Sequence, residues 1–274
     1  MSASAGVGRV LLLAAALLPG SAAAQLRPIE PVPWDALSSD GPVLRVGMAR
    51  HAGARAALAG TQGTLTEVGI YTGTWTLGRV AIEIGGVATR TFSDDSVYAA
   101  PVADTRASNG ERHMDTGEHR FATTVLLTAP TSPVDVVMRF GTRLPTTDNA
   151  QGLGRDQTDF FGGFGGRVRR RAVEAVGEAG IGILGTRLTR PEQVDVLLYA
   201  ARLGWNRERA RVWLETVGQH DTRRSAELRG LEDLNEARFV GEVGGDRRLR
   251  VTLVRGLTPA SVDLGIVLEG GFLF

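Results

Sequence analysis

The feature that most constrains the fold of this chain is a two-residue period in hydrophobicity that recurs over most of its length. From about residue 42 onward, segments of roughly ten residues alternate apolar with polar or small side chains and end at Gly, Pro, Asn or Asp. Periodicity of the helical kind is almost absent. In the clearest segment, 134–143, one face carries Val134, Val136, Met138 and Phe140, and the other carries Asp135, Arg139 and Arg143. This pattern predicts an all-β fold.

The alternation marks out about twelve strands. Most are long enough to cross a bilayer when tilted, since a transmembrane strand needs about 9–11 residues. Strands of globular proteins average only about 5–6 residues. The expected strands cover residues 42–52, 64–77, 79–92, 120–129, 134–144, 159–169, 172–184, 194–205, 209–218, 235–245, 247–256 and 261–274.

The connections between these strands alternate in length. The short set is Gly78, Pro130–Pro133, Arg170-Arg171, Asn206–Glu208 and Asp246. The long set is 53–63, 93–119, 145–158, 185–193 and 219–234, and only the last connection of this set, around Thr258–Ala260, is short. A soluble β-sandwich has no reason to sort its loops in this way, whereas an outer-membrane barrel has short periplasmic turns and long external loops. The sequence therefore predicts a transmembrane antiparallel up-and-down β-barrel.

Two strands carry apolar residues on both faces, which leaves their lipid-facing side open. The opposed sets are Leu65, Tyr71, Trp75 and Leu77 against Val68 and Ile70 in 64–77, and Val212 and Leu214 against Trp213 and Val217 in 209–218. Glycine pairs such as Gly162-Gly163 and Gly165-Gly166 indicate bends of the kind that a barrel needs to close.

The first segment, 1–24, has the features of a cleaved secretory signal. Arg9 precedes an apolar run, Val10–Leu18, and the segment ends in small residues, Ala22–Ala24. The run is shorter than the ~20 residues of a transmembrane helix. The expected organisation is a signal peptide at 1–24, a Pro-rich periplasmic N-terminal arm at 25–41 and a barrel in outer-membrane lipid at 42–274.

Composition excludes several classes of protein. The chain has no Cys, so it has neither disulfides nor thiolate metal sites. All 31 basic residues are Arg, against 30 acidic residues, and without segment 1–24, whose one charge is Arg9, the two signs balance. A nucleic-acid-binding protein would show a basic excess, so we expect no nucleic-acid partner.

If the apolar faces meet lipid, the opposite faces point polar side chains into the lumen. The expected lumen-lining residues are Arg45, Glu67, Glu83, Arg139, Arg143, Arg167, Arg169, Glu174, Glu178, Arg202, Arg238, Glu242, Arg250, Asp263 and Glu269. Charges of opposite sign on neighbouring strands predict ladders of ion pairs. Such a lumen is a pathway that selects small solutes by charge, or else a barrel plugged by its own salt bridges. Twelve strands lie between filled eight-stranded barrels and open sixteen-stranded porins, so size does not decide.

The carboxyl end, Leu268–Phe274, resembles the last strand of bacterial outer-membrane barrels. Its alternating apolar face carries Val262, Leu264, Ile266, Leu268, Phe272 and Phe274. The resemblance implies that Phe272 and Phe274 belong to the signal read by the barrel assembly machinery.

A second resemblance covers about 25 residues. Phe140–Asp148 with Gly152–Asp156 is similar to the strand, Leu-Pro-Thr, loop and Gly-x-Gly pattern of the outer-membrane transporter family associated with the MetA pathway of phenol degradation. This sequence has Thr147 where that family often has Gly. The resemblance implies the barrel architecture and a transport role.

Other functions stay open as alternatives. A lipid-modifying hydrolase would need a nucleophile beside an activating base; the four histidines, His51, His113, His119 and His220, fall in or beside expected external loops, outside any nucleophile motif. His113 and His119 with nearby acids suggest a metal site, but surface loop positions explain them better. No cofactor is expected, because no helix pattern follows Gly152-Leu153-Gly154. A structural or adhesive role through loop 93–119 is the third class.

Overall fold

The computed structural model describes residues 26–39, 41–100, 111–129, 131–144, 146, 153, 157–187, 191–222 and 233–274. The described chain is almost entirely β-sheet, with one short 3-10 helix, η3 (Ala36–Ser38). Its strands are β1 (Val43–Ala56), β2 (Thr61–Leu77), β3 (Val80–Val97), β4 (Arg112–Asp115), β5 (His119–Leu126), β6 (Val134–Leu144), β7 (Asp159–Arg170), β8 (Val173–Arg187), β9 (Pro191–Arg207), β10 (Ala210–Asp221), β11 (Leu234–Gly244), β12 (Arg247–Gly256) and β13 (Leu264–Leu273). Within these residues, no helix has the length and hydrophobicity to cross a membrane.

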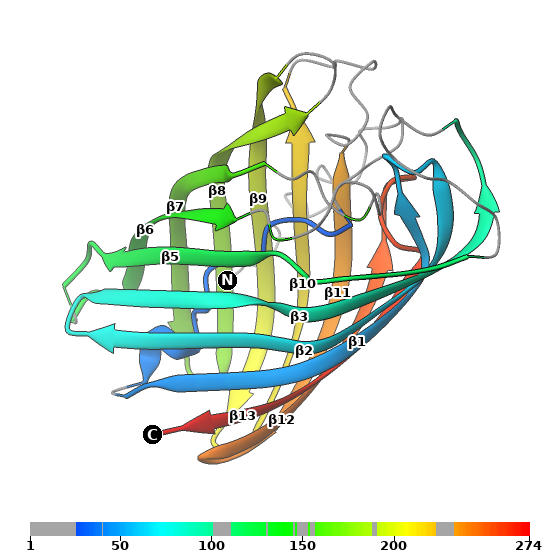
Figure 1. Cartoon of the computed structure of the whole chain (residues 1–274). Helices are drawn as coiled ribbons and strands as arrows, with labels where there is room; N and C mark the ends of the chain where they lie inside the picture. The colour runs from blue at the N-terminus through cyan, green and yellow to red at the C-terminus, as the bar shows by residue number, and fades with distance from the viewer. Residues whose placement is uncertain are drawn as a thin grey trace, which may run out of the picture.

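The strands form a closed antiparallel barrel (Figure 1). Each strand of the ring pairs with its neighbour in the chain, and β1 pairs with β13 to complete the closure. Among the described residues, twelve strands belong to the ring, while β4 pairs only with β3, beside Arg90–Ser93. The predicted up-and-down barrel of about twelve strands is therefore confirmed.

The two ends of the barrel differ in their connections. At one end, here called the turn end, β2 and β3, β7 and β8, β9 and β10, and β11 and β12 are each joined by two residues, and the C-terminus lies nearby (Figure 1). The opposite end is called the loop end. Two expectations for the loop end are wrong. The expected loop 53–63 is only a turn at 57–60, because β1 and β2 extend past their predicted ends, and the expected loop 185–193 is reduced to 188–190, because β8 and β9 do the same. The long connection expected at 93–119 is present between β3 and β5, as 98–118, and contains β4.

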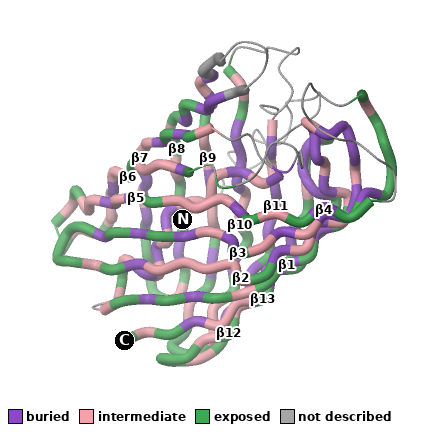
Figure 2. Tube along the Cα trace, viewed as in Figure 1, coloured by how far each residue is buried: buried purple, intermediate pink, exposed green. Residues whose placement is uncertain are grey.

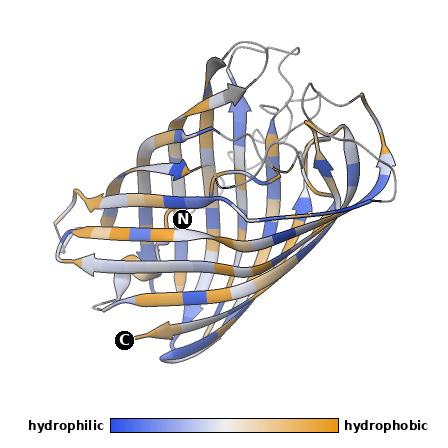
Figure 3. Cartoon of the chain, in the orientation of Figure 1, coloured by the Kyte–Doolittle hydropathy of each residue, from blue (hydrophilic) through white to orange (hydrophobic). Residues whose placement is uncertain are grey.

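Along the ring strands, outward-facing apolar residues alternate with buried residues, many of them polar (Figures 2 and 3). On β12, Leu249 and Leu253 are exposed on the outer face, whereas Thr252 is buried inside. An exposed apolar surface of this kind around the whole ring is the reverse of a water-soluble domain and is typical of a barrel that faces lipid.

A β-bulge explains why 64–77 carries apolar residues on both faces. Gly69, with φ of 68°, has no partner on β1, since Gly47 pairs with Ile70 and Met48 with Val68. The extra residue reverses the alternation. Before the bulge Leu65 is buried and Val68 is exposed; after it Trp75 is exposed.

In β10 the polar interior accommodates apolar residues. Val212 and Leu214 face outward, whereas Trp213 and Val217 are buried. Trp213 is buried because two guanidiniums, those of Arg202 and Arg250, each lie 5.0 Å from its ring.

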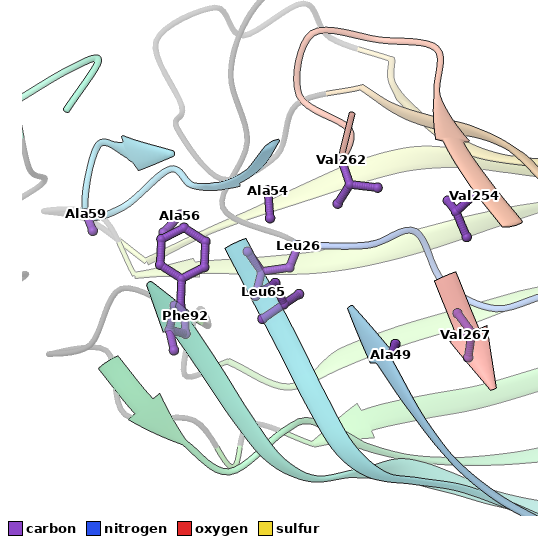
Figure 4. Packing of buried hydrophobic residues seen from close by; sticks show 11 residues of the cluster. Leu26, Ala49, Ala54, Ala56, Ala59, Leu65, Phe92, Val254, Val262 and Val267 are labelled. Carbon is purple, nitrogen blue, oxygen red and sulfur yellow. The ribbon is translucent and has the colours of Figure 1, made fainter. Parts of the chain in front are cut away.

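A hydrophobic cluster lies at the loop end of the lumen (Figure 4). Leu26, from the N-terminal segment, packs with Leu65 of β2, Phe92 of β3 and Val262. Val262 corrects an expectation, because the sequence places it on the lipid-facing side of the last strand. It lies before Leu264, where β13 begins, so the alternation of that strand does not extend to it.

Candidate functional site

The N-terminal arm, defined here as residues 26–39, lies inside the barrel and not in the periplasm as the sequence predicted. Leu26 belongs to the loop-end cluster. At the other end of the arm, Thr76, one residue before β2 ends, donates a hydrogen bond to the carbonyl of Ala36 at 3.4 Å. The arm therefore runs the length of the lumen from the loop end to the turn end. Its prolines lack N–H donors and favour an extended backbone, which lets the arm lie in the lumen without pairing as a strand.

Trp34 is the main apolar anchor of the arm. Its side chain is 1% exposed and packs with Val137 of β6 and Val176 of β8. The space for the ring comes from Gly165, where an added Cβ would lie 2.7 Å from the Trp34 ring. The indole Nε1 donates to Glu178 Oε1 at 2.6 Å. Because glycine leaves a gap in the wall and a carboxylate accepts the indole N–H, the site fits a tryptophan.

Glu30 joins the middle of the arm to the wall. Arg238 of β11 donates to both carboxylate oxygens of Glu30, at 2.6 and 3.0 Å. Arg139 of β6 donates to the backbone carbonyl of Glu30 at 2.8 Å. Two-point arginine–carboxylate contacts are among the strongest hydrogen bonds that side chains make.

Asp35 provides a second ionic attachment near the turn end. It accepts hydrogen bonds from Arg45 of β1 and from Arg250 of β12, the latter at 2.8 Å. Arg167 of β7 donates to the carbonyl of Trp34 at 2.7 Å. Arginines from five different strands, Arg139 and Arg238 included, thus hold the arm.

The charges of these arginines lower the pKa values of two acidic side chains of the arm, Glu30 and Asp35. Burial alone would raise the pKa of the Glu30 carboxyl, but the guanidiniums of Arg238 and Arg27 outweigh burial and hold this pKa well below its ordinary value. Burial opposes ionisation of Asp35 in the same way, and the guanidiniums of Arg45 and Arg250 hold its pKa below its ordinary value. Both acids are therefore ionised at neutral pH, as their ion pairs require.

The wall also carries ion pairs of its own. Glu83 accepts from Arg120 at 2.8 Å and from Arg139 at 2.8 Å and 3.0 Å. Further strand-to-strand pairs are Arg143–Asp159, Arg202–Glu174, Arg90–Glu67, Arg167–Asp135 and Arg250–Glu242. The structure thus brings most of the expected lumen residues to the interior, with Arg45, Glu83, Arg139, Arg143, Arg167, Glu174 and Glu242 buried and Glu178 and Glu269 partly buried.

Two expected lumen residues lie elsewhere. The side chain of Arg169 is 51% exposed, because β7 leaves the barrel wall at the turn end one residue later. Asp263 is exposed because it precedes β13, in the connection from β12. Both residues lie at or beyond a strand end, where the alternation no longer sets the direction of a side chain.

A cavity of about 200 Å³ remains between the arm and the wall. Its charged lining comprises Arg27, Arg45, Arg90, Arg120, Arg143, Arg202, Arg238 and Arg250, with Glu30, Asp35, Glu67, Glu118, Glu215 and Glu269. The sequence does not predict the arm residues of this set, because the expected arm lies outside the barrel, and the wall residues Arg90, Glu118, Arg120 and Glu215 are also absent from the expected lumen set. One signal could have found the arm residues, since Val32 and Trp34 would gain nothing from an arm in open solvent.

Each of the four histidines lies near a polar side chain in the described structure, and His51 is 3.8 Å from Glu67. His113 lies 2.9 Å from Asp94, His119 lies 2.7 Å from Tyr71, and His220 lies 2.7 Å from Asp233. In the described ranges, no group of three or more His, Asp or Glu side chains is placed to hold a metal ion. Most of the loop part of the 140–156 motif lies outside the described residues. These residues are Pro145, Thr147, Asp148, Gly152 and 154–156, whereas Thr146 and Leu153 are described.

No protein-family model and no curated protein matches the sequence. Solved structures of similar fold include LpxR from Salmonella typhimurium, with 9% identity, coverage of 85% of this chain and 100% of that chain, and a TM-score of 0.46. The Pseudomonas putida toluene transporter TodX has 10% identity, covers 94% and 99%, and has a TM-score of 0.37. A porin refined at 1.8 Å resolution has 11% identity, covers 85% and 98%, and has a TM-score of 0.39.

Proposed function

We propose that this protein is an outer-membrane channel for small solutes, which its own N-terminal arm holds closed. The arm occupies the lumen along its length, and the remaining cavity of about 200 Å³ is lined by charged groups. The exposed apolar outer face supports the membrane location. The resemblance of 140–156 to the transporter family of the MetA pathway supports the transport role.

One observation carries the proposal that the arm can leave. Wall arginines that hold the arm each have a second, acidic partner on the strands. These pairs are Arg238–Glu236, Arg250–Glu242 and Arg167–Asp135, with closest N···O distances of 2.8, 2.7 and 2.6 Å. When the arm departs, these guanidiniums stay paired and water fills the space. Departure therefore avoids the large cost of leaving buried charges without partners.

A barrel sealed for structural reasons would be built differently. Its interior would be apolar, because well-packed hydrophobic residues stabilise a buried site at least as well as ion pairs do. Here the apolar contacts of the arm concentrate at Leu26 and Val32–Ala36, and the stretch between them faces the cavity. The arm is thus attached at the two ends of the lumen by apolar contacts, whereas water can replace its ion pairs through Glu30 and Asp35.

The remaining parts of the proposal concern assembly. Phe272 is 43% exposed and Phe274 is 75% exposed at the turn end. Their exposure leaves both rings available to the barrel assembly machinery, in keeping with the role that the resemblance of the last strand implies.

The test compares two forms of the protein in planar lipid bilayers: residues 25–274, and residues 40–274, which lack the arm. Folding of each is confirmed first by β-sheet circular dichroism and by a heat-dependent gel shift in detergent. We expect rare, brief openings from the longer form and steady stepwise currents from the shorter form. Equal currents from both would contradict the proposal, as would silence from a folded shorter form.

A second variant covers the case in which the shorter form does not fold. Glu30→Gln with Asp35→Asn removes both acidic attachments of the arm and keeps the chain length. We expect more frequent openings than in the unchanged protein. Glu208→Gln with Asp246→Asn, two exposed acids in the turns, is the matched control and should leave the openings unchanged.

A further inference from the structure

The turn end of the barrel carries a one-sided group of exposed arginines. Turns β7–β8, β9–β10 and β11–β12 are neighbours in the ring, since β7 to β12 are consecutive. They carry six exposed arginines, which we name the basic arc: Arg169, Arg170, Arg171, Arg207, Arg209 and Arg247. The exposed acids in the same turns are Glu208 and Asp246. Elsewhere at this end, the β2–β3 turn carries one exposed arginine, Arg79, and the β5–β6 connection, 127–133, has no charged residue.

The basic arc has an excess of positive charge that the protein does not neutralise. In the part of the chain that the structure describes, no carboxylate lies within 4.0 Å of Arg170, Arg171, Arg209 or Arg247. Arg169 has only a contact to Asp135 at 3.5 Å. These guanidiniums differ from those of the lumen, where arginines such as Arg90, Arg143 and Arg238 have acidic partners. The arc is therefore free to bind anions from outside the protein.

The arc lies directly beside the apolar outer face. Val168 and Val173 flank the β7–β8 turn and are 47% and 51% exposed. Trp205, at 43% exposure, precedes Arg207, whose guanidinium lies 5.3 Å from the Trp205 ring. Tryptophan beside exposed aliphatic residues marks the boundary between hydrocarbon and headgroups. Arginines one or two residues beyond this boundary are at the depth of lipid phosphates, within reach of their long side chains.

We propose that the basic arc binds the headgroup phosphates of anionic glycerophospholipids in the leaflet that meets the turn end. A guanidinium donates two parallel hydrogen bonds to a phosphate, and a cluster of them favours lipids with net negative charge over zwitterionic ones. The lipid site is distinct from the lumen and does not depend on whether the channel conducts. It rests on the proposed membrane location of the barrel.

The test measures which lipids associate with the barrel. Residues 25–274 are reconstituted into phosphatidylcholine vesicles, and the fractions of spin-labelled phosphatidylglycerol and spin-labelled phosphatidylcholine immobilised at the protein are compared. We expect a preference of about threefold or more for phosphatidylglycerol at low salt, which salt weakens. The triple variant Arg170→Gln, Arg171→Gln, Arg209→Gln removes three of the six arginines of the arc and should reduce this preference clearly, and an unchanged preference would overturn the lipid site.

A charge-matched control separates the arc from net charge. Arg50, Arg112 and Arg255 are exposed in the loop-end half, and their replacement by Gln should leave the preference unchanged. Equal association of both lipids with the unchanged barrel would overturn the lipid site alone. Loss of the preference for phosphatidylglycerol in the control triple would also overturn the lipid site. So would abolition of this preference by glycerol phosphate in solution, because that result would assign the arc to a soluble anion. A barrel that does not insert into vesicles would contradict the membrane location and the lipid site together.

Discussion

The substitution Trp34→Ala tests whether the arm holds the channel closed. The Trp34 side chain is almost fully buried, so its truncation removes packing against Val137, Val176 and the gap at Gly165. Replacing a buried tryptophan by alanine costs about 3–5 kcal/mol. The loss of the indole donor to Glu178 adds to this cost. Since each ~1.4 kcal/mol changes an equilibrium tenfold, the docked arm should be disfavoured by about two to three orders of magnitude.

The assay is single-channel recording of the refolded protein in a planar bilayer. We expect the open probability of Trp34→Ala to rise strongly, while the conductance of the open state changes little. Trp75→Ala is the matched control, because Trp75 is 58% exposed on the outer face. It should leave the open probability unchanged. If the Trp34 variant folds and its open probability equals that of the Trp75 variant, the arm does not close the lumen.

Three further predictions follow from the same geometry. The acidic attachments Glu30 and Asp35 have lowered pKa values, so their stabilisation of the docked arm is complete above their ordinary pKa values and declines as pH falls below them. The frequency of openings should therefore be constant from neutral pH down to about 5 and increase in stronger acid. The increase should be smaller in Glu30→Gln with Asp35→Asn, and an increase between pH 8 and 6 would refute this prediction. Gly165→Val should expel the Trp34 ring and raise the open probability, whereas Gly166→Val, at a site with no atom near the added Cβ, should not; equal recordings from the two variants would count against the packing. The wall of the cavity without the arm carries seven arginines and four acids, and five of these arginines also pair with Glu83, Asp159, Glu174, Glu236 and Glu242. The charges of the pathway are therefore nearly balanced, so reversal potentials of the form 40–274 in a salt gradient should lie close to zero, and a strong preference for either sign of ion would contradict this assignment of the pathway.

The barrel could be predicted from the sequence because lipid outside and polar groups inside impose one repeated alternation. The strands around Arg139 and Glu174 show this, since each charged residue lies opposite apolar neighbours that face lipid. The alternation misleads where the backbone departs from a regular strand. Gly69 reverses it with a bulge, and Asp263 lies before its strand begins.

The occupied lumen could not be predicted by the same reasoning. The prolines at 28, 31 and 33 indicate an extended segment, but an extended segment can lie beside a barrel or within it. Its place depends on contacts between distant parts of the chain, such as Glu30 with Arg238 and Trp34 with Glu178. Nothing in local periodicity marks such contacts.

The most direct test of the central claim is to tether the arm to the wall. The chain has no cysteine, so Glu30→Cys with Arg238→Cys, replacing two residues whose side chains are in contact, can be joined by a short thiol-specific cross-linker that contains a disulfide. Single-channel currents are then recorded before and after a reductant is added to the folded, cross-linked barrel. The account predicts silence while the tether is intact and stepwise openings once it is cut. Currents that are the same before and after reduction would show that the arm does not control passage through the barrel.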